Sequence, residues 1–211
     1  MKNKLPFFKL FFEVWIHPRK VIQTILDKES NYFTWPLVIT YAILETSNPI
    51  PCALVVKILP LTLALLTGTA MSVFFTAIIF LFFSWSSYFL GKLMGGKATF
   101  AEIRTACAWA FPPAFFGTLS FSIVNVPLWI KILEGETSWA SISSQPKMEW
   151  QIFFTGFFNL LILWALILWL INVAQAHRFS IWKSIAIGLV SSTIFCISFI
   201  TLFYILLRIQ I

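Results

Sequence analysis

The stretch LTLALLTGTAMSVFFTAIIFLFFSWSSYFL, residues 61–90, contains no charged side chain and decides the fold class. As a helix it is about 45 Å long at about 1.5 Å per residue. That length exceeds the hydrocarbon core of a bilayer, which is about 30 Å thick. Small residues recur every four positions on one face, at Ala64, Gly68, Ser72 and Thr76. Because small side chains let helix backbones approach closely in lipid, this stripe predicts a contact with another membrane helix.

The composition of the whole chain agrees with a membrane protein. Of the 211 residues, 59% are apolar and only 11% are charged, whereas about 25% are charged in a typical soluble domain. The chain also contains 24 Phe and 10 Trp. A water-soluble domain of this size still exposes much of its surface and could not hide so many apolar side chains.

The apolar runs predict an all-α fold, namely a polytopic membrane helical bundle with about five transmembrane helices at 32–211. The expected spans are about 35–56, 64–90, 103–126, 151–174 and 182–206. Prolines mark expected helix breaks, because proline lacks the backbone donor that a helix interior needs. These prolines are Pro49 and Pro51 in the first span, and Pro112 and Pro113 in the third.

Two further stripes of small residues predict helix packing in the third and fifth spans. One stripe includes Ala106 and Ala110, and the other includes Gly188 and Ser192. They fit internal packing of the bundle or, as an alternative, a homo-oligomer formed through one stripe.

The segment at 1–31 predicts two short amphipathic helices on the membrane surface. In the first helix the apolar face consists of Phe7, Phe8, Phe11, Phe12 and Trp15. In PRKVIQTILDKE, residues 18–29, apolar residues fall on one helical face while Arg19 and Lys20 remain for anionic lipid headgroups. The alternative is that this helix packs on the protein's own cytoplasmic loops, and the sequence does not decide between the two.

The distribution of positive charge predicts the orientation of the chain. With the N-terminus inside, the expected inner side carries Lys2, Lys4, Lys9, Arg19, Lys20, Lys28, Lys92, Lys97, Arg104, Arg178 and Lys183. The outer side carries Lys57, Lys131, Lys147 and Arg208. Because Lys and Arg favour cytoplasmic loops, this bias predicts a cytoplasmic N-terminus and an outer C-terminus. The net charge of +7 is therefore assigned to topology, and no nucleic-acid partner is expected.

A few polar side chains fall at membrane depth, where ionisable groups are costly and often functional. They are Glu45, Asn48, Asn159 and Arg104. One interpretation is a polar intramembrane site on an ion or solute path, since some transporters build such sites at broken helices. The other is structural: Glu45 lies at the outer interface and Asn159 hydrogen-bonds a neighbouring helix.

The sequence contains none of the motifs expected of common catalytic sites. It has no HExxH, GxSxG, P-loop or GxGxxG pattern, and its only Asp is Asp27. The three cysteines, Cys52, Cys107 and Cys196, lack metal-type spacing. We therefore expect no enzyme activity, no cofactor and no metal.

Several motifs together resemble one family. They are HPRK at 17–20, GGKATFAEIRTACAWAFPP at 95–113, a W-x-x-x-x-W pair late in the fourth span, and SIWKS at 180–184. This order resembles the Yip family of Ypt/Rab-interacting, five-pass membrane proteins, which has bacterial members. The cytoplasmic DLYGP-type motif of the eukaryotic members is absent. The resemblance implies a bacterial-type member, which is expected in a bacterial cytoplasmic (inner) membrane.

The resemblance implies a non-enzymatic protein that organises membrane or recruits partners. The expected partners are the lipid bilayer, its anionic headgroups and a protein on the cytoplasmic side. Arg19, Lys20 and Lys97 would form the surface for headgroups or partners. The alternative function is a small transporter or channel with a polar site near the broken first span. Solute flux through a Glu45→Gln variant in proteoliposomes would separate the two.

Overall fold

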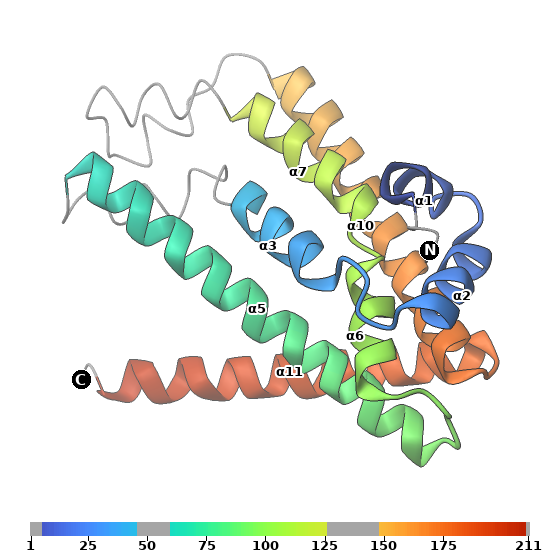
Figure 1. The fold of residues 1–211 in the computed structure, drawn as a ribbon. Helices are drawn as coiled ribbons and strands as arrows, with labels where there is room; N and C mark the ends of the chain where they lie inside the picture. The colour runs from blue at the N-terminus through green and yellow to red at the C-terminus, as the bar shows by residue number, and fades with distance from the viewer. Residues whose placement is uncertain (1–5, 46–59, 126–147, 210–211) are drawn as a thin grey trace.

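The computed structural model describes residues 6–45, 60–125 and 148–209, and all the regular structure in these residues is helical. Two short helices come first, α1 (Phe7–Glu13) and α2 (Pro18–Lys28), followed by α3 (Thr34–Glu45) and the long α5 (Leu61–Leu93). The chain continues through α6 (Phe100–Ala108), α7 (Pro112–Val124), α10 (Met148–His177) and α11 (Ile181–Ile209). Figure 1 shows α7 lying along α10, with α1 and α2 beside that pair.

Four stretches of the described residues are long and apolar enough to cross a membrane. They are Leu65–Leu93, Phe100–Val124, Ile152–His177 and Ile181–Thr201. The helical membrane bundle predicted from the sequence is therefore confirmed, with four of the expected five spans among the described residues. Of the expected first span, α3 covers the part up to Glu45, and the remainder, including Pro49 and Pro51, lies outside the described residues.

The third span is the centre of the bundle and is interrupted. In the most apolar part of this span, 61% of the residues are buried. In the corresponding part of the span formed by α5, only 6% are buried. The chain leaves helical geometry after Ala108, and α7 restarts with Pro112 and Pro113 in its first turn. Proline is tolerated there because a first-turn amide has no helical acceptor. At the other end of the span, Thr99 and Glu102 form the expected capping box.

The amphipathic helix α2 packs on the protein itself. Val21, Ile22 and Ile25 are almost completely buried and belong to the same apolar core as Ile103 and Val173. Of the two alternatives for this segment, internal packing therefore describes α2, and the surface it contacts is formed by α6 and α10. This contact is made with membrane-spanning helices, and α2 lies beside α10 (Figure 1).

The remaining spans are joined to this centre by polar and aromatic contacts. The Ser72 hydroxyl on α5 donates to the carbonyl oxygen of Ala42 on α3, at 2.9 Å. The Ser184 hydroxyl on α11 donates to Leu170 of α10, at 2.7 Å. Farther along, the rings of Phe195 on α11 and Phe83 on α5 have centroids 5.5 Å apart.

Candidate functional site

The first helix, α1, presents an apolar ridge to its surroundings. Phe8, Phe12 and Ile16 follow one another at intervals of four residues and are 77%, 57% and 75% exposed. We call these three residues the α1 ridge. Phe8 and Phe12 are four residues apart and lie on one face of α1, and Ile16 follows in the turn after the helix. Phe12 also approaches Phe116 of α7, whose ring centroid lies 6.5 Å away. Because Phe116 is itself exposed on a candidate span, the ridge continues the outer apolar surface of the bundle.

The opposite face of α1 is held by aromatic rings of the connector and the third span. The ring of Phe7 stacks on Phe33 at 4.4 Å and meets Trp109 edge-on at 5.8 Å. The ring of Phe11 lies 5.8 Å from Phe115. Aromatic pairs at these separations contribute about 0.5–1.5 kcal/mol each beyond their buried area. These contacts fix which side of α1 points outward.

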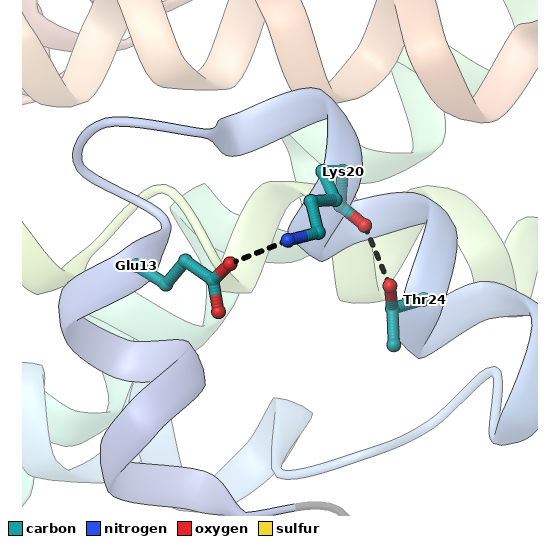
Figure 2. A network of polar contacts seen from close by, with 3 residues as sticks. All are labelled: Glu13, Lys20 and Thr24. Atoms are coloured by element: carbon teal, nitrogen blue, oxygen red, sulfur yellow. Dashed lines mark hydrogen bonds and ion pairs between the residues drawn. The ribbon is translucent and has the colours of Figure 1, made fainter.

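An ion pair joins α1 to α2, as Figure 2 shows. The Lys20 ammonium donates to the Glu13 carboxylate at 3.0 Å, and the Thr24 hydroxyl donates to the backbone carbonyl of Lys20 at 2.8 Å. The Lys20 ammonium lowers the pKa of the Glu13 carboxyl below its ordinary value. The Glu13 carboxylate is therefore charged at neutral pH, and it loses that charge when the pH falls through the lowered pKa.

Basic side chains stand next to the α1 ridge. Arg19 and Lys20 are exposed in the first turn of α2. They line a pocket of about 390 Å³ together with Ile16, His17, Pro18 and Ile171. The expected headgroup surface formed by Arg19 and Lys20 is thus accessible and adjoins apolar side chains. Lys97, the third residue expected on that surface, is exposed in the α5–α6 loop.

The connector between α2 and α3 is clamped to α6 by side chains of the GGKATFAEIRTACAWAFPP motif. The Arg104 guanidinium donates to the Asn31 side-chain oxygen at 3.2 Å, and the Thr105 hydroxyl donates to the Ser30 carbonyl. The buried Trp109 indole donates to the Tyr32 carbonyl at 2.9 Å. This motif therefore positions the N-terminal helices on the bundle.

Of the four polar residues expected at membrane depth, Glu45 and Arg104 contact different parts of the described structure. Glu45 accepts a hydrogen bond from the Thr118 hydroxyl of α7 at 3.2 Å. Arg104, by contrast, lies in α6, before the break in the third span, and its guanidinium contacts Asn31 of the connector. Asn159 is exposed on α10, and Asn48 lies outside the described residues.

The residues expected to pack helices together behave unequally. Ala106 and Ala110 are buried, and a Cβ placed on Gly188 would lie 3.0 Å from the Trp169 ring. Ser192 is exposed and Ser191 is buried in its place. The reason is geometric: a helix has 3.6 residues per turn, so a stripe at constant spacing of four rotates away from the contact face. Near Gly68, no described atom lies within 4 Å of an added Cβ.

Sequence reasoning missed a buried histidine. His177 is 1% exposed, its Nε2 donates to the Ser87 carbonyl oxygen at 3.1 Å, and its ring fits between two glycines. A Cβ on Gly91 would lie 2.0 Å from Nε2, and one on Gly96 would lie 2.2 Å from Nδ1. The available sequence signal is Gly91 and Gly96 in GKLMGG, because glycine permits the close approach of another group.

The described residues hold no group of three or more His, Cys, Asp or Glu side chains placed to bind a metal ion. The buried Cys107 accepts a hydrogen bond from the Trp169 indole at 3.2 Å. The described residues form a surface that combines the α1 ridge with the adjacent cations Arg19 and Lys20. The connector between α2 and α3 is held on α6 by hydrogen bonds.

Comparison with known proteins gives one match. The Yip1 domain model matches residues 12–203. No curated protein and no solved structure is detectably similar to the chain. The match runs from α1 almost to the end of α11 and so includes the clamped connector, the interrupted third span and the glycine-flanked histidine. The chain is a multi-pass integral membrane protein and belongs to the Yip1 domain family.

Proposed function

We propose that this Yip1 domain protein performs no chemistry and organises the membrane in which it is embedded, through its α1–α2 surface. The observation that carries the proposal is the α1 ridge, three large apolar side chains exposed beside Arg19 and Lys20. An amphipathic surface with large apolar side chains beside cations lies in the plane of the membrane interface. Its apolar side chains lie among the acyl chains, and its cations lie at the anionic headgroups. The surface would face the cytoplasmic leaflet, as the distribution of Lys and Arg predicts.

The packing of α1 supports a fixed wedge and not a loose tail. Phe7 and Phe11 hold one face of the helix against the bundle, and the Glu13–Lys20 pair ties it to α2. A wedge held in one leaflet enlarges that leaflet relative to the other. The same position leaves Arg19 exposed, so that it can contact an acidic protein partner.

A vesicle experiment tests this proposal. The full chain is reconstituted in vesicles that contain anionic lipid, and vesicles captured through an N-terminal tag carry α1 on the outer leaflet. We expect their mean diameter, measured by electron cryomicroscopy, to fall below that of protein-free vesicles. Replacing the α1 ridge by serine, in Phe8→Ser/Phe12→Ser/Ile16→Ser, should restore the protein-free diameter, because serine gains nothing from acyl chains.

The matched control replaces the same three residues by leucine, which keeps them apolar and should keep the small diameter. Charge reversal in Arg19→Glu should weaken the effect in anionic vesicles only, and it leaves the Glu13–Lys20 pair intact. Equal diameters for the parent chain and the serine variant would reject the proposal.

The transport alternative has less support among the described residues. Its proposed site is formed around Glu45, Asn48 and Asn159, and Asn48 lies outside the described residues. Glu45 is hydrogen-bonded to Thr118, while Asn159 is exposed on α10. We therefore favour the membrane-organising function.

A further inference from the structure

The α5–α6 loop and the α10–α11 turn are joined to each other at one end of the bundle. The backbone N–H of Lys97 donates to the carbonyl oxygen of His177 at 3.2 Å. The Lys183 ammonium donates to the carbonyl oxygen of Met94 at 2.8 Å. Two segments far apart in the sequence therefore form one continuous surface, which we call the basic end and define as residues 91–100 and 177–184.

Buried packing makes the basic end rigid. The His177 ring occupies the space between Gly91 and Gly96, and the ring of Phe179 stacks on it with centroids 5.0 Å apart. The Gly96 amide also donates to the Gly91 carbonyl at 2.7 Å. A surface whose backbone is fixed in advance loses little conformational freedom when it binds a ligand.

The charge of the basic end is strongly positive. Four exposed cations belong to it, namely Lys92, Lys97, Arg178 and Lys183. Neither of its two segments contains an acidic residue. The nearest acid in the sequence, Glu102, is engaged in the capping box, where its carboxylate accepts from the Thr99 amide at 2.5 Å. Lys183 has two further N–H groups to offer besides the one used by Met94, because an ammonium carries three donors.

Apolar side chains border these cations. Leu93 is 70% exposed and Trp182 is 76% exposed, and each is adjacent in sequence to one of the lysines. Both residues continue the outer surfaces of candidate spans that begin or end here. Tryptophan beside cations at the end of a span is typical of the headgroup level of a bilayer.

We propose that the basic end binds the phosphate of an anionic phospholipid from the surrounding leaflet. Charge complementarity selects an anion, and continuity with the apolar outer surface of the spans selects a lipid over a soluble phosphate. Basic clusters between helix ends on the cytoplasmic side recognise anionic headgroups in this way. The site consists of other residues than the α1–α2 surface, so it does not depend on the function proposed above.

The test uses the full chain in zwitterionic detergent micelles, with phosphatidylglycerol titrated in and thermal unfolding as the readout. A ligand that binds the folded state raises the unfolding temperature as its concentration passes the dissociation constant. For the parent chain we expect phosphatidylglycerol to stabilise at lower concentration than phosphatidylcholine. In Lys92→Gln/Lys97→Gln the apparent dissociation constant for phosphatidylglycerol should rise about 10- to 30-fold.

Three further samples separate the alternatives. Arg208→Gln removes a cation from the far end of α11 and should leave the dissociation constant unchanged. A rise of the same size in Arg19→Glu would contradict the assignment, because the readout would then report the α1–α2 surface. Inorganic phosphate alone should not stabilise the parent chain.

An unchanged constant in Lys92→Gln/Lys97→Gln, or equal stabilisation by phosphatidylcholine, would overturn the lipid assignment. Stabilisation by inorganic phosphate at the same concentrations would also overturn it and would indicate a soluble anion. If the double variant without lipid unfolds at a much lower temperature than the parent, the dissociation constant of the single variant Lys97→Gln is measured in its place. That variant keeps the backbone hydrogen bond from residue 97 to His177.

Discussion

Gly91→Ala is expected to destabilise the protein by about 1–3 kcal/mol, the usual cost of forcing an extra carbon into a packed site. The new Cβ would lie 2.0 Å from the imidazole Nε2 of His177, and that ring is confined by Gly96 on its other side. Moving the ring would also break its hydrogen bond to Ser87. The measurement is thermal unfolding of the detergent-solubilised full chain.

The control for this substitution is Gly68→Ala, in the same helix. No described atom lies within 4 Å of a Cβ at Gly68, and alanine is favoured over glycine in a helix interior by about 0.8–1.0 kcal/mol. Gly68→Ala should therefore leave the unfolding temperature unchanged or raise it. If both variants shift the temperature equally, the close contact between Gly91 and His177 does not contribute as described.

Trp109→Ala is expected to cost about 3–5 kcal/mol, as for other large buried aromatic residues. The indole is completely buried, stacks against Tyr32 with centroids 6.1 Å apart, and donates to the Tyr32 carbonyl. Its loss leaves a cavity and also releases Phe7 of α1. Besides a lower unfolding temperature, we expect faster proteolysis in the connector that follows α2.

Trp182→Ala is the matched control, because this tryptophan is 76% exposed. It should change stability in detergent by much less than Trp109→Ala and should leave the rate of proteolysis in the connector unchanged. Equal effects of the two substitutions would mean that Trp109 does not clamp the connector.

The parts of the fold that depend on local sequence were predictable. The spacing of Val21, Ile22 and Ile25 predicts a helix with one apolar face, and that face is buried. Proline in a first helical turn and the T-x-x-E pattern at Thr99 depend on neighbouring residues only. The first rule agrees with α7 beginning at Pro112, and the second with α6 beginning after Thr99.

The parts that depend on contacts between distant segments were not predictable. The burial of His177 requires Gly91 and Gly96, more than 80 positions earlier in the sequence. The phenylalanines of α1 look alike in sequence, yet Phe7 and Phe11 face the bundle while Phe8 and Phe12 are exposed. That division is set by Trp109 and Phe115, which no local pattern connects to α1.

The candidate site was predictable in its cations but not in its arrangement. Arg19 and Lys20 are exposed as expected from their place on the polar face of α2. The ion pair between Lys20 and Glu13 depends on the turn around Pro18, whose direction the sequence does not specify. Similarly, the contact of Arg104 with Asn31 depends on the connector folding back onto α6, which the local sequence does not specify.

The depth of α1 in the bilayer tests the central claim most directly. A spin label is placed at residue 12, on the α1 ridge, or at residue 27, on the exposed side of α2, in a chain without its native cysteines. Collisions with oxygen, which concentrates among acyl chains, are compared with collisions with a water-soluble nickel complex. We predict that the label at residue 12 is reached by oxygen and the label at residue 27 by nickel. Equal access of nickel to both labels would contradict the account, because α1 would then stand in water.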